Sequence, residues 1–291
     1  MRRRHVPFGR VLLLYSGTLA ALVLAGLGLV SLSLYVGQRY MLYENAIYGD
    51  IANPRRIGMV GVRPVKVATV DGLTLNMWYK KAFPGCPTIL YFHGNDGDVK
   101  ARAFKMEPLL HAGWGALFAE YRGYAGNPGN PSEDGLYEDA RAAVHHLATE
   151  GVPAEKLVLM GESLGSGVAV KMAEEYDPAG LVLVAPYTSI SDVAQVMYWF
   201  VPAGLLIRDR FPSIARIGNL HSPVLIIHGE DDKTIPVSFA RKLLAAAAEP
   251  KQGVFIPGGG HTDLFAKGAV DVIADFVDGK RACALDAERA E

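Results

Sequence analysis

Residues 157–167 read LVLMGESLGSG: an apolar run typical of a buried strand, the pattern Gly-x-Ser-x-Gly, and a helical stretch beginning at Ser163. A serine on a sharp strand-to-helix turn needs very small neighbours, and Gly161 and Gly165 meet that need. The turn lifts the hydroxyl clear of the sheet, and the helix N-terminus offers unpaired N–H groups to a negative charge. The bare pattern occurs often by chance, but its strand–turn–helix setting predicts that Ser163 is a nucleophile.

Outward from this stretch, short apolar runs recur along the chain with helical stretches between them. The apolar runs are TILYF (88–92), ALFAEY (116–121), LVLM (157–160), LVLVA (181–185) and VLIIH (224–228). The helical stretches are 100–111, 133–149, 163–176, 236–248 and 264–277. Short runs that are apolar at every position are typical of strands covered on both faces. Their alternation with helices predicts an α/β fold, with a mostly parallel sheet and helices on both faces.

Two segments of alternating polarity precede the parallel strands. Residues 65–70 and 73–78 are joined by Asp71-Gly72. A two-residue Asp-Gly connection tolerates positive φ, so the segments predict an antiparallel hairpin that leads into the sheet. Ligand sites in such sheets lie at the carboxyl ends of the parallel strands, and chemistry is therefore expected at that edge.

A serine hydroxyl is a weak nucleophile until a base removes its proton. The candidate base is His261, in the glycine-rich loop 258–263, where it is free to reach the end of another strand. The alternative is an ordinary histidine on a surface loop. The acid that orients the base should follow the run VLIIH, where Glu230, Asp231 and Asp232 are consecutive. Spacing alone does not rank these three carboxylates.

The run TILYF leads into a polar, glycine-rich loop, residues 93–98. At this edge of the sheet the backbone N–H of Asn95 is expected to pair with that of Leu164 and hold an oxyanion. The alternative is a metal-binding loop formed by His93 and the two nearby aspartates. Its spacing fits neither an EF-hand nor a zinc site, so neither a metal nor a cofactor is predicted.

The first forty residues differ from the rest. Residues 1–10 are basic, with Arg2, Arg3, Arg4 and Arg10, and residues 11–36 carry no charged side chain. About twenty apolar residues cross a bilayer, so this run predicts a single membrane anchor. A cleaved signal peptide and a buried core helix are the alternatives. The arginines favour a cytoplasmic tail, which would put the remaining chain on the non-cytoplasmic side.

Composition excludes several partners. The formal net charge is −1, and phosphate binding needs a concentrated basic surface, so nucleic acid is not an expected partner. The only two cysteines, Cys86 and Cys283, cannot make a disulfide framework. They are either unrelated thiols or, in an oxidising compartment, one disulfide. The oligomeric state is left open.

The motifs together carry a family likeness over about residues 65–277. They are YFHGNDGD (91–98), EYRGYAGNPGNPSEDGLYEDARA (120–142), GESLGSG (161–167), APYTSISDV (185–193), LLIRDRF (205–211), HGEDDKTIP (228–236) and GGGHTDL (258–264). In this order they resemble the Bem46-like branch of the α/β-hydrolases, which is related to mammalian ABHD17-type depalmitoylases. The resemblance implies the α/β-hydrolase fold, Asp232 as the triad acid, and hydrolysis of esters or thioesters without a cofactor. One departure is Tyr187, where phenylalanine is commoner.

The segment at about 187–220 is too long for an ordinary loop and is rich in apolar residues. It falls where this fold usually inserts a cap, and it predicts either a packed helix pair or an apolar wall for an acyl chain. Its turn Arg208-Asp209-Arg210 is expected to be solvated or paired, or else to contact substrate. The expected domains are a tail and anchor (1–40), a linker of irregular chain (41–64), the hydrolase domain (65–280) and a frayed tail (281–291).

These features predict a serine hydrolase with Ser163 as nucleophile, His261 as general base and Asp232 as acid. The anchor and the apolar cap favour a lipid-like or acylated substrate. Two alternatives remain open: a membrane-tethered binding or scaffold protein that keeps the fold without turnover, and a serine peptidase of the same fold.

Overall fold

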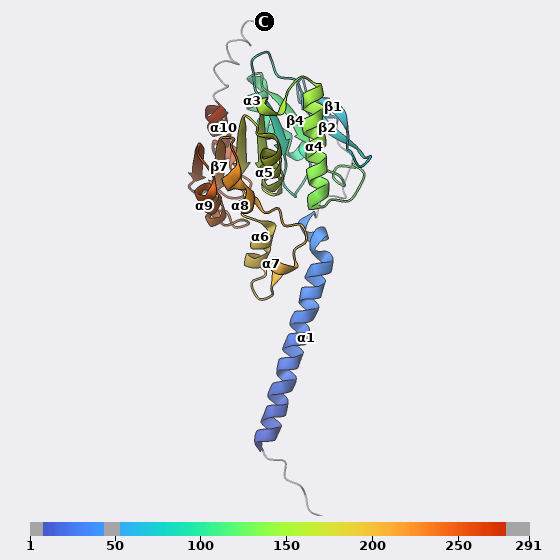
Figure 1. Ribbon diagram of the computed structural model, residues 1–291, viewed down its shortest axis with the longest axis vertical. Coiled ribbons are helices and arrows are strands. Elements are labelled where there is room, and N and C mark those ends of the chain that lie inside the picture. The colour runs from blue at the N-terminus through green and yellow to red at the C-terminus, as the bar shows by residue number, and fades with distance from the viewer. Residues whose placement is uncertain (1–7, 44–52, 278–291) are drawn as a thin grey trace, which may run out of the picture.

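The computed structural model describes residues 8–43 and 53–277 (Figure 1). Its centre is an eight-stranded sheet in the order β1-β2-β4-β3-β5-β6-β7-β8. The strands are β1 (Arg63–Ala68), β2 (Thr74–Lys80), β3 (Thr88–Phe92), β4 (Gly115–Ala119), β5 (Leu157–Glu162), β6 (Gly180–Val184), β7 (Val224–Gly229) and β8 (Lys251–Ile256). Strand β2 is antiparallel to both β1 and β4, and the other pairs are parallel. The predicted α/β-hydrolase fold, with its mostly parallel sheet, is confirmed.

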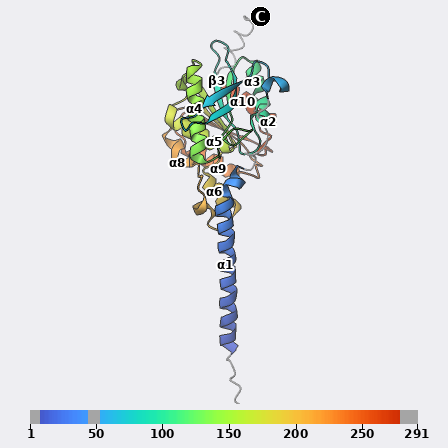
Figure 2. The same ribbon diagram turned by 90° about the vertical axis from the view of Figure 1, so that its right-hand side faces the viewer.

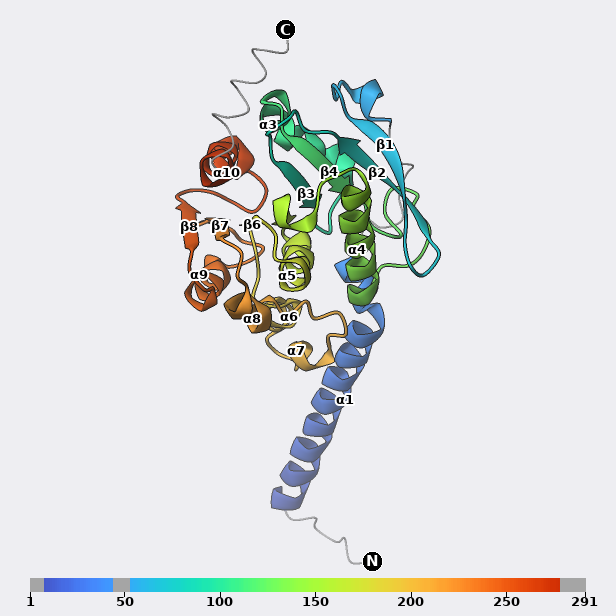
Figure 3. The same ribbon diagram turned by 45° about the horizontal axis from the view of Figure 1, so that its top comes forward.

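Helices cover both faces of this sheet (Figure 3). The helices of the described residues are α1 (Phe8–Leu42), α2 (Val99–Arg102), α3 (Glu107–His111), α4 (Glu133–Thr149), α5 (Leu164–Tyr176), α6 (Ile190–Met197), α7 (Ala203–Leu206), α8 (Ser213–Arg216), α9 (Val237–Ala246) and α10 (Ala269–Val277). Short 3-10 helices are η1 (Pro54–Ile57), η2 (Ala103–Met106), η3 (Ala154–Lys156), η4 (Ile217–Asn219) and η5 (Phe265–Lys267). Buried side chains of α4, α5 and α9 form one core with the sheet, and those of α2, α3 and α10 form the other.

Local geometry differs from the expectation at three places. The hairpin connection is three residues long, not two: the Thr69 N–H donates to the Leu73 carbonyl, and residues 70–72 connect the two, with Gly72 at φ +88°. The helix expected over 100–111 is divided into α2, η2 and α3. The helix expected over 264–277 is divided at Gly268, whose φ of +95° ends η5 before α10 begins. Positive φ favours glycine, so Gly268 acts as a terminator here.

Helix α1 is long and apolar enough to cross a membrane: within Tyr15–Leu42, its most apolar 18-residue window has a mean hydropathy of 2.3. No residue of this window is buried, which contradicts a buried core helix. The helix also continues to Leu42, so it includes the first two residues of the segment 41–64 that was expected to be irregular chain. Residues 44–52 of the expected linker lie outside the described residues.

The cap is formed by α6, α7 and α8, between β6 and β7 in the sequence. Helices α6 and α7 lie beside the C-terminal end of α1, which leads away from the domain (Figures 1 and 2). Leu34 of α1 packs against a small buried cluster of the cap, Ala194, Val201 and Ala203. Cap and helix thus meet at the carboxyl edge of the sheet, the edge at which a site is expected.

Candidate active site

Ser163 lies between β5 and α5 with φ +51° and ψ −118°, a conformation that a non-glycine residue adopts only where its surroundings impose it. Close backbone contacts supply the constraint. A Cβ atom at Gly161 would collide with the Gly165 backbone, and one at Gly165 would collide with the carbonyl oxygen of Phe92. The Ser163 N–H donates to the carbonyl of Val184 at 2.9 Å. The predicted strand–turn–helix geometry around Ser163 is present.

His261 and Asp232 come together with Ser163 although they lie far apart in the sequence. The Nε2 atom of His261 is 3.0 Å from Ser163 Oγ, and its Nδ1 atom is 2.7 Å from Asp232 Oδ2. The loop that carries the histidine is fixed by a hydrogen bond from the Gly260 N–H to Asp263 Oδ1 at 2.7 Å. This arrangement allows the imidazole to take a proton from the serine while the carboxylate stabilises the resulting imidazolium.

The carboxylate of Asp232 is buried and fully hydrogen-bonded. Its Oδ1 atom accepts the N–H groups of Thr234 and Ile235, both at 2.8 Å. Burial alone would raise the pKa of Asp232. Hydrogen bonds from the rings of His228 and His261 and from the Ile235 N–H outweigh that effect, and the pKa lies well below its ordinary value.

The other two candidate acids point elsewhere. Asp231 is exposed, and only its backbone N–H is tied to the histidine loop, at the Gly259 carbonyl. Glu230 is exposed and pairs with Arg241 at 2.8 Å. Of the three adjacent carboxylates, therefore, only that of Asp232 reaches the imidazole.

The loop after β3 lies directly against the serine. A Cβ atom at Gly94 would lie 3.3 Å from Ser163 Cβ, so this close approach favours glycine. Asn95 and Leu164 both line the pocket at Ser163. Leu164 is the first residue of α5, so its N–H has no partner within the helix. The carbonyl of Asn95 accepts the Tyr124 hydroxyl at 3.3 Å, which helps to hold the loop.

A buried pair that the sequence analysis did not identify supports the same loop. The ring of His93 lies between the Gly94 carbonyl oxygen, 2.7 Å from Nδ1, and Glu120 Oε1, 2.8 Å from Nε2. Both side chains are fully buried. Glu120 Oε2 also accepts the N–H of Val99 at 2.9 Å. The pair therefore connects the end of β3, the end of β4 and the start of α2.

The same geometry separates the side chains of the alternative metal-binding loop. His93 is buried in the pair with Glu120, Asp96 is 74% exposed, and Asp98 caps α2 by accepting the Ala101 N–H at 2.9 Å. Across residues 8–43 and 53–277, no group of three histidine, cysteine or acidic residues could hold a metal ion.

A second buried carboxylate stands immediately before the nucleophile. Glu162 accepts hydrogen bonds from the Tyr91 hydroxyl at 2.5 Å, from Lys105 Nζ at 2.7 Å and from Arg102 Nη1 at 3.2 Å. Burial would raise the pKa of Glu162, but the two cations and the hydroxyl lower it below its ordinary value. Burial in turn lowers the pKa of Lys105. This network secures the strand that ends at Ser163.

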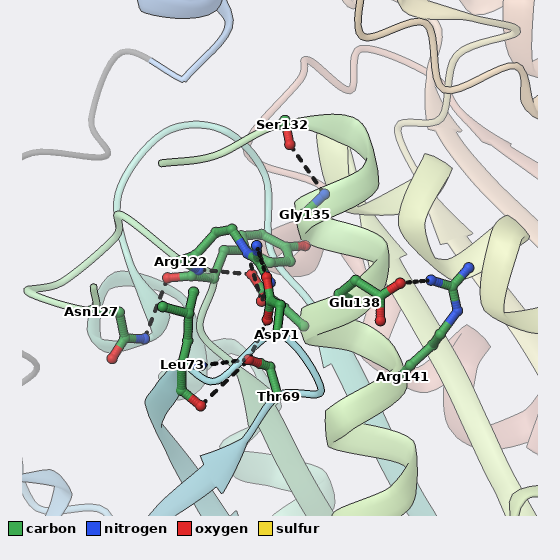
Figure 4. Close-up of polar contacts among 11 residues, drawn as sticks. Thr69, Asp71, Leu73, Arg122, Asn127, Ser132, Gly135, Glu138 and Arg141 are labelled. Carbon is green, nitrogen blue, oxygen red and sulfur yellow. Dashed lines mark hydrogen bonds and ion pairs between the residues drawn. The ribbon is translucent and has the colours of Figure 1, made fainter. Parts of the chain in front are cut away.

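A further network holds the long loop between β4 and α4 (Figure 4). Arg122 donates to both oxygens of Asp139 on α4, through its backbone N–H at 2.8 Å and its Nε at 2.9 Å. It also contacts Asp71 of the β1–β2 turn at 2.7 Å. Burial raises the pKa of Asp139 to about 6, against the opposing hydrogen bonds from Arg122. The network fixes the chain that follows Glu120.

The pocket beside Ser163 is lined by α1, the cap helices α6 and α7, and the loops that carry Asn95 and Thr234. No charged side chain occurs among the described residues that line it. Tyr187 lies in its wall, and its hydroxyl donates to the Leu164 carbonyl at 3.0 Å. The departure from phenylalanine at this position therefore adds a bond to the first residue of α5. The contribution of α1 to the pocket was not predicted.

Comparisons with known proteins agree with this architecture. A family model described as serine aminopeptidase, S33, matches residues 86–215. The protein Rv2307c of Mycobacterium tuberculosis is 41% identical over 265 residues, which cover 89% of this chain and 92% of the relative. The α/β hydrolase domain-containing protein 17C of Xenopus tropicalis is 32% identical over 203 residues, 67% of this chain and 63% of the relative. These matches confirm the resemblance drawn from the motifs.

Among solved structures, the esterase Pf2001 of Pyrococcus furiosus superposes with a TM-score of 0.65. The aligned parts cover 80% of this chain and 97% of the esterase, at 17% sequence identity. This likeness shows a shared fold.

Proposed function

Because this chain belongs to the α/β-hydrolase superfamily, in the family described as serine aminopeptidase S33, we propose that it cleaves carboxylic esters or thioesters. Ser163 is the nucleophile, His261 the general base and Asp232 the orienting acid. The observation that carries the proposal is the unbroken line of hydrogen bonds from Ser163 Oγ through the imidazole to the buried carboxylate, 3.0 Å and 2.7 Å long.

The reaction proceeds in two halves. Ser163 Oγ attacks the acyl carbon while His261 Nε2 takes its proton, and the N–H groups of Asn95 and Leu164 hold the tetrahedral oxyanion. The imidazolium returns the proton to the leaving alcohol or thiol, which leaves an acyl-enzyme. Water, activated by the same imidazole, then releases the acid and restores the serine.

A fluorophosphonate probe tests the nucleophile directly, because it phosphonylates an activated serine. The full-length protein in detergent should be labelled, and Ser163→Ala should abolish labelling and lower ester hydrolysis by roughly 10³-fold or more. Ser238→Ala, an exposed serine on α9, is the matched control and should label normally. Labelling that persists in Ser163→Ala would exclude Ser163 as the nucleophile. A protein that stays unlabelled would instead favour the scaffold alternative.

The description of the matching family raises aminopeptidase activity as a second candidate. An aminopeptidase must bind the cationic N-terminus of its substrate, which calls for an acidic group close to the nucleophile. The described lining of the pocket at Ser163 carries no such group. The apolar lining favours an acyl chain, and comparing p-nitrophenyl esters, acyl thioesters and aminoacyl anilides would decide between the two activities.

We also propose that α1 is an uncleaved, single-pass membrane anchor. Support comes from its length and apolar character over Tyr15–Leu42 and from its packing against the cap through Leu34. A cleaved signal sequence would not remain in contact with the folded domain. The partners that follow are the bilayer and a lipid-like or acylated substrate, with the hydrolase domain on the non-cytoplasmic side.

A further inference from the structure

The C-terminal turns of α1 form part of the pocket that contains Ser163. Leu34, Gln38, Met41 and Leu42 all line it. Their spacing of i, i+4, i+7 and i+8 places them on one face of the helix. The helix that is expected to cross the membrane therefore presents a continuous stripe to the active site.

Polar contacts fix this face of α1 to the cap. Gln38 is buried; its Nε2 donates to the Leu206 carbonyl at 3.2 Å, and its Oε1 accepts the Arg208 N–H at 2.7 Å. Arg39 donates to both oxygens of Asp209, at 2.9 Å and 3.0 Å. A two-bond arginine–carboxylate contact fixes orientation as well as distance. The turn that was expected to be solvated, paired or in contact with substrate is thus paired with α1 through Asp209.

Apolar surface continues from α1 onto the tip of the cap. Trp199 and Leu205 are 78% and 79% exposed, and Met197 and Phe200 are 57% and 47% exposed. Soluble proteins seldom leave such large side chains together in water, so this surface suits the bilayer that α1 enters. The cap tip and α1 then form one apolar boundary, with the pocket behind it.

From this arrangement we propose that α1 is a wall of the substrate site, and that the pocket takes one acyl chain arriving directly from the bilayer between α1 and the cap. This inference rests on the proposed ester or thioester hydrolysis. A chain that moves from lipid into an equally apolar pocket keeps its methylene groups out of water throughout, whereas release through water would lose their hydrophobic stabilisation. The substrate class is therefore a membrane-resident acyl ester or thioester.

Because α1 is part of the pocket, an anchor that only held the domain at the membrane would not keep the pocket closed. Without α1, Asp209 would lose its two bonds to Arg39, and Gln38 would no longer bridge the chain at Leu206 and Arg208. The pocket would then open to water along one side. Removal of α1 is therefore expected to change chain-length preference as well as location.

A photocrosslinking probe tests the proposal on the unmodified, full-length protein in phosphatidylcholine nanodiscs. The probe is a long-chain alkyl fluorophosphonate with a diazirine at the chain end. It should phosphonylate Ser163 and, on illumination, join its chain end to a peptide of α1 or of the α6–α7 cap. Phosphonylation with crosslinks only elsewhere would overturn this inference and leave the hydrolase proposal intact. Absence of phosphonylation would instead overturn the proposed function.

Substitutions that narrow the pocket give an independent measure. Leu34→Trp and Met41→Trp should lower the ratio of palmitoyl to acetyl p-nitrophenyl ester hydrolysis by about tenfold or more. Val36→Trp is the matched control, because Val36 is 75% exposed on α1 and does not line the pocket. If the ratio of palmitoyl to acetyl ester hydrolysis were the same in Leu34→Trp, Met41→Trp and Val36→Trp, α1 could not form a wall of the pocket.

Discussion

The Oδ2 atom of Asp232 lies 2.7 Å from Nδ1 of His261, while the adjacent carboxylate of Asp231 is exposed. Only the Asp232 carboxylate can therefore accept a hydrogen bond from the Nδ1–H of His261. This leaves Nε2 unprotonated and able to take the proton of the Ser163 hydroxyl. In Asp232→Asn the amide can donate to Nδ1, which favours the wrong tautomer. The expected fall in kcat is roughly 10³-fold to 10⁴-fold, against less than about twofold for Asp231→Asn.

Rates of ester hydrolysis by the two full-length variants measure this difference. Asn keeps an oxygen that can accept the N–H groups of Thr234 and Ile235, so the turn should remain folded and the melting temperature can be checked separately. If Asp231→Asn proves to be the inactive variant, the acid must be reassigned to Asp231.

The depressed pKa of Asp232 determines how this part of the site responds to acid. A carboxyl whose folded pKa lies below its unfolded value, about 3.9, contributes stability above that value and loses it as the pH falls toward the folded pKa. The melting temperatures of wild type and Asp232→Asn should therefore differ most near neutral pH and converge below about pH 4. Melting curves from pH 3 to pH 7 measure this difference, and a gap that widens in acid would contradict the assignment.

Much of the fold was predictable because each buried parallel strand is a short apolar run with a clear beginning and end. TILYF coincides with β3, and the helix predicted over 133–149 coincides with α4. The break of the stretch 100–111 was harder to predict, although Pro108 gave a signal, since proline favours the first turn of a new helix. The local sequence therefore predicts where helices and strands lie more reliably than where a helix is interrupted.

Residues of the site that act through distant partners could not be read from the sequence. His93 and Glu120 are separated by 27 positions, and Tyr91 and Glu162 by 71, so no local spacing reveals either contact. The pocket face of α1 was hidden for another reason. Lipid-facing and cap-facing positions are both mostly apolar in α1, so periodicity does not distinguish them. Within residues 34–42, only Gln38 and Arg39 interrupt the apolar pattern.

The buried contact between Glu162 and Lys105, 2.7 Å long, gives a prediction about stability. Glu162→Leu would leave Lys105, whose side chain is only 9% exposed, without its carboxylate. Breaking a buried pair in this way costs about 3–5 kcal/mol. For a domain of this size the melting temperature should fall by roughly 6 °C or more.

Two variants control this measurement, made by thermal unfolding in detergent. Glu138→Leu removes a partly exposed surface pair with Arg141 and should cost less than about 1 kcal/mol. The double variant Glu162→Leu/Lys105→Met also removes the buried ammonium group and should recover part of the loss, because Arg102, the other cation beside Glu162, still contacts Asp96. A double variant no more stable than Glu162→Leu would show that the pair is not the cause.

The last prediction concerns orientation in the membrane. Arg2, Arg3, Arg4 and Arg10 precede the apolar run, whereas Arg39 and the pair at 55–56 follow it. Basic residues near a short tail keep that tail in the cytoplasm, so the hydrolase domain is expected on the far side. Carboxyl-terminal fusions test this: alkaline phosphatase, active only outside the cytoplasm, should give signal, and green fluorescent protein, fluorescent only inside, should not. Replacing the four tail arginines by glutamine should weaken the bias. Signal from the fluorescent fusion alone would reverse the orientation. It would also remove the oxidising setting in which a disulfide between Cys86 and Cys283, the latter outside the described residues, could persist.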